Sequence, residues 1–166
     1  MVILKTAEEI ERLRESNLLV SKTLAELAKY IKPGITTEKL NNIADEYIRD
    51  HKAVPAFLGY SGFPKSICTS VNSEVVHGIP SERVLEEGDI ISVDCGVILN
   101  GYVGDTAYTF EVGNVSEEIK KLMRITREAL MLGIQEAVAG NRTGDIGHTI
   151  QQFCENEGFG VVRELV

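Results

Sequence analysis

The sequence predicts an α/β (α+β) fold in which amphipathic helices cover a small antiparallel sheet. Three observations favour this class: apolar residues at helical spacing in two regions, an Asn-Gly dipeptide between two apolar runs, and a helix-pair pattern that occurs twice. The chain has 166 residues, of which 43% are hydrophobic. A chain of this size buries about 68–70% of its unfolded surface, so we expect one globular domain with a real core.

The N-terminal region predicts two helices. Thr6 and Glu9 form a capping-box pattern ahead of an apolar stripe that ends at Pro33-Gly34. A second helix is expected at Thr37, its predicted cap. The apolar faces comprise Ile10, Leu13, Leu19, Leu24, Leu27 and Ile31 in the first helix, and Leu40, Ile43, Ala44, Tyr47 and Ile48 in the second.

A β-hairpin is the clearest feature of the middle region. A loop rich in glycine and aromatic residues, 56–66, precedes a short predicted strand at residues 67–71. A second loop leads to the stretch ISVDCGVILNGYVGDTAYTF, residues 91–110. Within it, Asn100-Gly101 predicts a two-residue type I′ turn, which needs a positive φ at both positions. This turn sets the cross-strand register of the whole hairpin.

The C-terminal region repeats the pattern of the first helix pair. Ser116 is expected to begin a third helix that ends at Gly140, Thr143 precedes a fourth, and the closing letters FGVVRELV predict a strand. A shift of 106 residues places Gly34 on Gly140 and Thr37 on Thr143. We interpret this match as an internal duplication whose second copy lacks a hairpin. The sequence is therefore expected to be the front part of a longer protein.

Two acidic residues lie inside the predicted hairpin. In the expected register Asp94 faces Ala107, and Asp105 shares that face, so the two carboxylates are diagonal neighbours about 7–8 Å apart at the backbone. Like charges this close on a partly buried surface raise one pKa or require a cation. The pair predicts either a proton-sharing dyad for acid/base catalysis or a site for divalent metal ions. A hairpin face open to water, with solvated acids, is the alternative.

His77 is the second candidate for a functional side chain. It lies in a loop and is followed by Gly-Ile-Pro, which is typical of a rigid loop that presents one side chain. His51 and His148 are assigned no role. The three cysteines are widely spaced, which fits neither a disulfide framework nor a CxxC metal knuckle, so we expect buried apolar fillers. They are Cys68, Cys95 and Cys154.

Composition excludes several classes of function. The chain carries 17 Lys and Arg against 25 Asp and Glu, a net charge of −8, and has no basic run that could follow a phosphate backbone. Nucleic acid is therefore not an expected ligand. The N-terminus turns charged too early for a signal peptide, and no apolar run is long enough for a membrane span. We expect a cytoplasmic protein without a membrane partner.

Three segments, SICTSVNSEVVHGIP, EEGDIISVDCGVILNGYVGDTAYTF and GFGVVREL, resemble the type I methionine aminopeptidases of bacteria. The His-Gly-Ile-Pro loop, both aspartates and their spacing of eleven all match. The resemblance implies a pita-bread fold with a pseudo-twofold repeat, with residues 1–166 as the N-terminal portion of the catalytic domain. Repeat one would cover about 6–112, and an incomplete repeat two about 113–166.

The resemblance also implies an activity, a cofactor and partners. The family removes the initiator methionine from new polypeptides with one or two divalent metal ions, for which Co, Mn, Fe and Zn are candidates. The implied partner is a peptide or nascent-protein N-terminus, with the ribosome as a further candidate. Asp94 resembles the family's bidentate metal ligand and Asp105 its bridging ligand. His77 resembles the catalytic histidine that contacts the substrate backbone and stabilises the oxyanion.

A substrate pocket is implied in the same way. Tyr60, Phe63 and Cys68 resemble the walls of the family's methionine pocket, and an aromatic slot with a sulfur contact suits an unbranched thioether. Phe57 occupies a pocket position that is usually small. That substitution would narrow the pocket or repack its edge.

The resemblance breaks at the C-terminus. The family continues after VVRELV with a Gly-His-Gly segment, a second substrate histidine and two ligating glutamates, which this sequence does not contain. We therefore expect an inactive or weakly active form that self-associates through unpaired strand edges. Two alternatives stay open: a non-catalytic paralogue that binds peptide N-termini or a partner protein, and a dipeptidase of the same fold that acts on proline-containing peptides. The aromatic residues of GYSGFPKSIC favour methionine over the latter.

Overall fold

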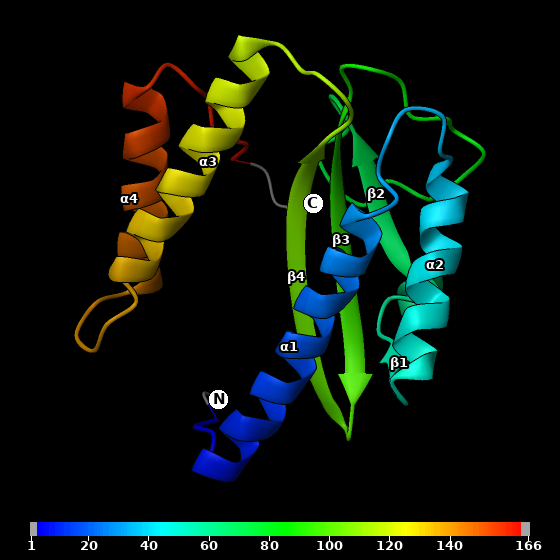
Figure 1. Cartoon of the computed structure of the whole chain (residues 1–166). Helices are drawn as coiled ribbons and strands as arrows, with labels where there is room; N and C mark the ends of the chain where they lie inside the picture. Colours follow the sequence, from blue (N-terminus) through cyan, green and yellow to red (C-terminus); the bar gives the residue numbers. More distant parts are fainter. Residues whose placement is uncertain (1–2, 164–166) are drawn as a thin grey trace. The chain divides into compact units, whose positions relative to one another are not determined.

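A computed structural model describes residues 3–163, which form two compact units divided after Val115 (Figure 1). The first unit contains helices α1 (Ala7–Ala28) and α2 (Thr37–Asp50) and strands β1 (Val54–Pro55), β2 (Ile67–Val71), β3 (Ile90–Leu99) and β4 (Tyr102–Glu111). A short 3-10 turn, η1 (Tyr60–Gly62), interrupts the loop between β1 and β2. The second unit contains α3 (Glu117–Gln135) and α4 (Thr143–Asn156). Among the described residues, no helix is both long and apolar enough to span a bilayer.

The predicted capping box begins α1. The Thr6 hydroxyl accepts from the Glu9 N–H at 3.2 Å, and the Glu9 carboxylate accepts from the Thr6 N–H at 2.8 Å. The helix ends at Ala28, one turn before the predicted end, because Lys29 already donates to the carbonyls of Glu26 and Leu27 in the closing turn. Ile31 still packs against the core from beyond the helix.

The cap of α2 differs from the prediction by one residue. Thr36, not Thr37, is the N-cap, and its hydroxyl accepts from the Lys39 N–H at 3.1 Å. The Thr37 hydroxyl instead donates to the Ser81 carbonyl at 3.0 Å and accepts from the Ser81 N–H at 2.9 Å. A contact with a distant segment therefore decides which threonine caps the helix.

Strand β3 is the centre of an antiparallel sheet, with β4 along one side and both β1 and β2 along the other. The hairpin has the predicted register, from Leu99↔Tyr102 at the turn to Ile90↔Glu111 at the open end. Asn100 and Gly101 have φ values of 52° and 83°, as a type I′ turn requires. The predicted short strand is β2, with the expected bounds.

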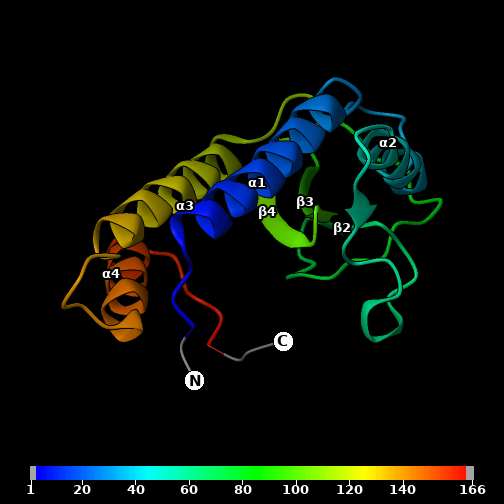
Figure 2. The same ribbon diagram turned by 90° about the horizontal axis from the view of Figure 1, so that it is seen from below.

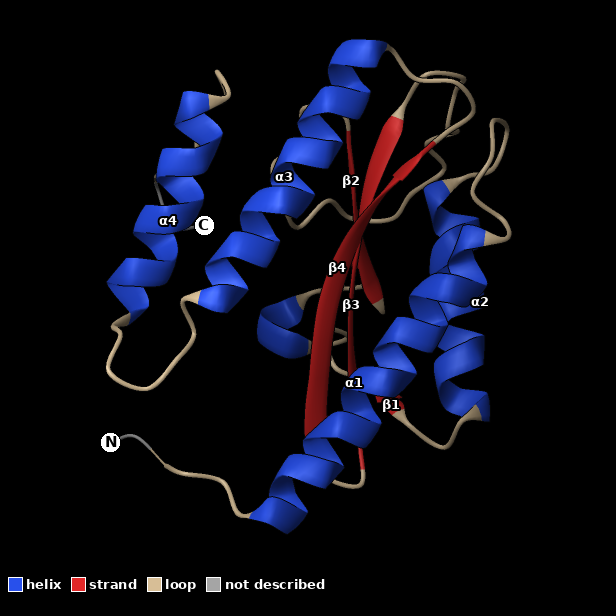
Figure 3. Ribbon diagram, turned by 60° about the vertical axis from the view of Figure 1, so that its left-hand side comes forward, coloured by secondary structure: helices blue, strands red, loops and turns tan. Residues whose placement is uncertain are grey.

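The two faces of this sheet differ in what covers them. Helices α1 and α2 lie on one face, and the loop between β1 and β2 lies on the other (Figures 2 and 3). Large, fully buried side chains of the core between helices and sheet include Leu27, Leu40, Ile48, Ile67, Ile91, Val93 and Val97. We call the opposite side the acidic face. It is formed by alternate positions of three strands, namely Cys68, Ser70, Ser92, Asp94, Gly96, Asp105, Ala107 and Thr109.

Helix α1 crosses the hairpin at Gly104. A Cβ at this glycine would lie 2.5 Å from the Ser16 carbonyl carbon and 2.6 Å from the Asn17 nitrogen. Beside this contact, the Ser16 hydroxyl donates to the Tyr102 carbonyl at 3.0 Å, and the Asn17 side-chain oxygen accepts from the Asp105 N–H at 3.3 Å. The helix therefore holds the backbone of one of the two acidic residues.

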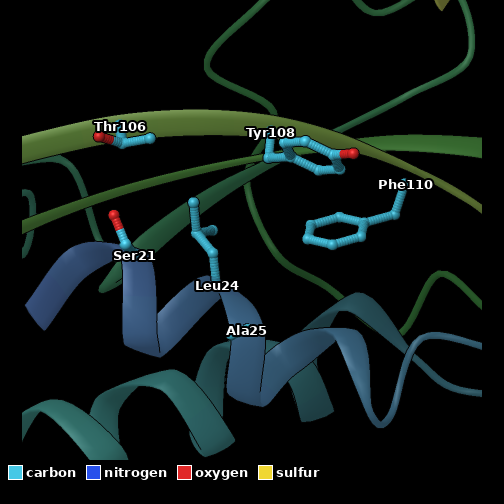
Figure 4. A pocket seen from close by; sticks show the side chains of 6 residues that line it. All are labelled: Ser21, Leu24, Ala25, Thr106, Tyr108 and Phe110. Carbon is cyan, nitrogen blue, oxygen red and sulfur yellow. The ribbon is translucent and has the colours of Figure 1, made fainter. Parts of the chain in front are cut away.

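A shallow pocket of about 260 Å³ lies farther along the same helix, on the helix-covered face (Figure 4). Side chains of α1 form one wall and side chains of β4 the other. The rings of Tyr108 and Phe110 lie with centroids 4.8 Å apart. This pocket is on the opposite side of the sheet from the acidic residues, so it is separate from the candidate site. Its lining residues are Ser21, Leu24, Ala25, Thr106, Tyr108 and Phe110.

The second unit departs from three sequence expectations. Helix α4 includes Thr143, which was expected to precede it, and has Arg142 as its N-cap. Helix α3 starts after the predicted Ser116 cap but ends at Gln135, before Gly140. Residues 159–163 of the expected C-terminal strand are not in a strand, and 164–166 lie outside the described residues. Helices α3 and α4 pack through Ile125, Ala129 and Cys154.

Substituting Gly104→Ala should destabilise the first unit. The added methyl group would overlap the α1 backbone, and overpacking of this kind costs about 1–3 kcal/mol. Val103→Thr is the control, because Val103 is the neighbouring residue and its side chain is half exposed. This near-isosteric change should alter the free energy of unfolding by no more than about 0.5 kcal/mol. Urea unfolding followed by circular dichroism measures both. Equal unfolding midpoints for the two variants would contradict the close contact.

Candidate functional site

The hairpin brings Asp94 and Asp105 to one face, as the sequence predicts. Asp94 pairs with Ala107 and Asp105 pairs with Gly96, so the two acids are diagonal neighbours across β3 and β4. Burial raises the pKa of the Asp94 carboxyl above its usual value, and the charge and hydrogen-bond contact of Asp105 raise it further. The two carboxylates therefore repel each other where Asp94 is partly buried and Asp105 is exposed.

His77 opposes this repulsion. It lies close enough to Asp94 for its positive charge to lower the pKa of that carboxyl. The side chain is exposed, and its backbone has a φ of 60°, the left-handed region that residues other than glycine seldom adopt. The structure therefore pairs the two aspartates on one face and brings His77 within electrostatic range of Asp94.

Cysteine side chains flank the acids without acting as thiolates. Burial, then the charges of Asp94 and Asp105, raise the pKa of Cys68 to about 11. Cys68 pairs with Asp94 across β2 and β3, whereas Cys95 points to the helix-covered face and has a pKa of about 12 from the same causes. Both stay protonated at neutral pH and are poor metal ligands in that state. All three cysteines are buried and free, as expected of apolar fillers.

The first residues of the aromatic loop, residues 56–66, pack against the acidic face. A Cβ at Gly96 would lie 2.6 Å from the Phe57 ring, so this ring covers the position directly opposite Asp105. Tyr60 is 75% exposed and Phe63 is half-buried, and the Phe63 N–H donates to the Tyr60 carbonyl at 2.9 Å in a tight turn. Phe57 and Cys68 therefore lie at the acids, and Tyr60 and Phe63 lie on the outer turn.

A polar network on α2 holds the end of the aromatic loop. The Ser66 N–H donates to the Asn41 side-chain oxygen at 2.9 Å, and the Ser66 hydroxyl donates to Asp45 at 2.7 Å. Arg49 binds both oxygens of Asp45, at 2.7 and 3.1 Å, and this lowers the pKa of the Asp45 carboxyl. The sequence interpretation missed this network. Its signal is the four-residue spacing of Asn41, Asp45 and Arg49 on one helix face.

Hydroxyl groups form a row beside the acids, which the sequence interpretation also missed. Ser70 pairs with Ser92, and Ser92 pairs with Thr109, one row from Asp94 on the acidic face. The Ser92 and Thr109 hydroxyls lie 2.7 Å apart. Period-two alternation of Ser and Thr with the acids was the available signal.

The two carboxylates fit part of a divalent-metal site. Carboxylate oxygens are ligands for hard and borderline divalent ions, and a cation would offset both the burial and the Asp105 charge that raise the pKa of Asp94. Within residues 3–163, no group of three or more His, Cys, Asp or Glu side chains is placed to hold an ion. Asp94 and Asp105 therefore supply two ligands, and the rest of the coordination would come from water or from further protein.

The Asp45–Arg49 pair should make stability depend on pH. The pKa of Asp45 is lower in the folded chain than in the unfolded chain, so its stabilisation is present above pH about 4 and is lost as pH falls through the folded-state pKa. Asp45→Asn should cost about 0.5–1 kcal/mol at pH 7, given the partial exposure of the pair, and much less at pH 2.5.

Urea unfolding at a series of pH values measures this difference. Asp50→Asn is the control, because Asp50 lies at the exposed end of the same helix. If Asp45→Asn lowers the free energy of unfolding equally at pH 7 and pH 2.5, the charge of Asp45 is not the source of the stabilisation.

Comparison with known proteins agrees with this geometry. A sequence profile of metallopeptidase family M24 matches residues 11–166. The chain is 54% identical to a methionine aminopeptidase of Clostridium acetobutylicum and 53% identical to methionine aminopeptidase 1 of Bacillus subtilis. Each match covers 100% of this chain and 67% of the relative, so the chain spans about two thirds of their length.

Solved structures give the same result for the fold. The crystal structure of methionine aminopeptidase from Rickettsia prowazekii matches with a TM-score of 0.96 and 42% identity, over 99% of this chain and 66% of that one. An Xaa-Pro dipeptidase from Bacillus anthracis matches with a TM-score of 0.79 and 24% identity, over 95% of this chain and 43% of that one, which shows a shared fold alone. The chain has the pita-bread fold and belongs to the methionine aminopeptidases of metallopeptidase family M24.

Proposed function

We propose that this chain carries part of the active site of a metal-dependent aminopeptidase that removes the N-terminal methionine from peptides and nascent proteins. The observation that supports the proposal is the diagonal pairing of Asp94 and Asp105 on one face of the sheet, with His77 within electrostatic range of Asp94. Relatives that are 54% and 53% identical bear the name methionine aminopeptidase, which supports the reaction.

Each side chain has a role that follows from its chemistry. Asp94 and Asp105 would hold one or two divalent ions, for which Co, Mn, Fe and Zn remain candidates. Such an ion supplies a Lewis acid and an activated water near neutral pH. The His77 imidazole, exposed beside the acids, can donate a hydrogen bond to the substrate backbone and so orient the scissile bond. It is also placed to stabilise negative charge that develops on the carbonyl oxygen.

The methionine side chain would contact the aromatic loop. Phe57 covers Gly96 beside the acids, and Cys68 is a protonated, buried thiol on the same face. A thioether gains from contact with aromatic rings and polarisable sulfur. Tyr60 and Phe63 would complete the pocket from the outer turn of the loop.

We infer low turnover for the 166-residue chain itself. Two carboxylates alone leave most coordination positions to water, and no cluster of three ligating side chains occurs in the described part of the chain. The same observation favours a second candidate function, binding of peptide N-termini or of a partner protein without cleavage.

The setting of the protein is inferred from its cysteines. Three free, buried cysteines suit a reducing compartment, and we infer the cytoplasm, where nascent chains are also available. The ribosome and a second copy of this chain are further proposed partners. Among the described residues no strand pairs with the outer edge of β4, and this edge supports self-association.

The metal proposal predicts the behaviour of three variants in calorimetric titration with Mn²⁺. The parent chain should bind weakly, and Asp94→Asn or Asp105→Asn should weaken binding about tenfold or more, because each removes one of only two ligating carboxylates. Glu111→Gln is the matched control, an exposed acid at the far end of the same hairpin. If Glu111→Gln weakens Mn²⁺ binding equally, the ion is attracted by the overall negative charge of the chain and not bound at a specific site.

Turnover separates the two candidate functions. Release of methionine from a Met-Ala-Ser peptide should be slow or absent with the 166-residue chain. It should appear when the corresponding C-terminal third of the Bacillus subtilis relative is fused to it, which is reasonable at 53% identity. Full turnover by the short chain would contradict the inferred need for further ligands. Peptide binding without turnover in either form would support the non-catalytic candidate.

A further inference from the structure

The loop that carries His77 is anchored directly to the outer edge of β2. We call residues 72–80 the histidine loop. The Thr69 N–H donates to the Gly78 carbonyl at 2.8 Å, and the Gly78 N–H donates to the Ser70 hydroxyl at 3.2 Å. Both polar backbone groups of Gly78 are thus bound to two consecutive residues of one strand.

Only a glycine fits at this anchor. A Cβ at Gly78 would lie 2.2 Å from the Thr69 carbonyl oxygen and 2.8 Å from the Thr69 carbonyl carbon. These are backbone atoms of a strand paired with β3 on its other edge, so they cannot move aside without disturbing the sheet. The loop backbone at Gly78 therefore packs directly against the β2 backbone, with no room for a side chain between them.

The residue before this anchor is strained. His77 has a φ of 60°, a conformation that costs residues other than glycine free energy and persists only where neighbouring contacts impose it. The contacts that fix the next peptide unit are those of Gly78 with Thr69 and Ser70. Loss of either would let the histidine relax toward negative φ and turn its imidazole away.

The other end of the loop is held separately. Glu74 accepts from the Val71 N–H at 2.7 Å and forms an ion pair with Arg83 at 3.0 Å. Ser81 is bound to Thr37 of α2. Since these contacts do not involve Ser70 or Gly78, the loop would stay attached if the Ser70 contact were lost, and the change would be confined to the region of His77.

Ser70 connects the loop to the carboxylates. Its side chain lies on the acidic face, 4% exposed, in the row next to Cys68 and Asp94. The proposed reaction does not use this hydroxyl, and its one described partner is the Gly78 N–H. A buried hydroxyl that binds the backbone next to a strained histidine is placed to control where that histidine points.

We propose that Ser70 and Gly78 are positioning residues that hold His77 in its left-handed conformation and present the imidazole to the Asp94–Asp105 pair. The inference rests on the proposed function, since it gives His77 a task, but it concerns residues to which that function assigns nothing. Ser70 and Gly78 would act through the histidine and would not touch the substrate.

The test is nuclear magnetic resonance of the labelled 166-residue chain with Ser70→Ala, which removes the hydroxyl. Two signals report the loop: hydrogen exchange of the Thr69 and Gly78 amides, and the Cα and Cβ shifts of His77, which depend on φ. A third signal, line broadening by Mn²⁺, reports the distance of the His77 ring from the carboxylates. The Ala107 methyl group, directly opposite Asp94, serves as the internal reference for bound ion.

In Ser70→Ala we expect amide exchange at Gly78 to rise about fivefold, as the loss of one ordinary hydrogen bond implies. The His77 shifts should move toward those of negative φ, and Mn²⁺ broadening of the His77 ring should fall while that of Ala107 is retained. Ser70→Thr, which keeps the hydroxyl, should restore all three signals. Ser92→Ala is the matched control, because it removes a partly buried hydroxyl of the acidic face that is bound to Thr109 and not to the loop.

Unchanged exchange and unchanged His77 shifts in Ser70→Ala would overturn the proposal, as would equal changes in Ser92→Ala, which would mark a general loss of stability. A parent chain in which Mn²⁺ broadens neither Ala107 nor His77 would count against the proposed metal function. In that case amide exchange and the His77 shifts, which need no metal, still decide the role of Ser70.

Discussion

The two-residue turn at Asn100-Gly101 is the constraint on which the site depends. In a hairpin, the number of loop residues decides which positions of the two strands share a face. With two residues in the turn, Asp94 and Asp105 point to the same side. If the same sequence formed its turn with one residue more or fewer, the register would shift by one residue, and one of these acids would point into the core beneath α1. Positive φ at both turn positions, supplied by asparagine and glycine, makes the two-residue form favourable.

Once the register is set, the packing on each face follows from composition. The helix-covered face of β3 presents Ile91, Val93, Cys95 and Val97, all buried, and α1 approaches β4 so closely that only Gly104 fits beneath it. The acidic face presents small side chains and hydroxyls around the two carboxylates. Packing on one face therefore holds two like charges together on the other. Burial, followed by the charge of Asp105, raises the pKa of Asp94.

Local signals in the sequence predicted the elements well, because each is set by neighbouring residues. The Thr6 and Glu9 capping box, the hairpin turn and the alternation that pairs the acids are of this kind. Contacts between distant segments could not be predicted in the same way. The Ser81 contact makes Thr36 and not Thr37 the cap, and Ser70 meets Gly78 only after the histidine loop has folded back on β2. The C-terminal segment shows the same limit, since an apolar pattern forms a strand only beside a partner, and residues 159–163 are not paired.

The sheet and the loops contribute differently to function. The same fold occurs in an Xaa-Pro dipeptidase, so the fold does not by itself determine the function. Under the proposed function, the choice of substrate would come from the two loops at the acidic face, one of which runs directly into β2 while the other is hydrogen-bonded to it. The aromatic loop ends at Ser66, held by Asn41 and Asp45, and the histidine loop is held at Thr69 and Ser70. Strand β2, which pairs with Asp94 through Cys68, thus connects the two loops, and under the proposed function a change within it would alter substrate contacts without replacing Asp94 or Asp105.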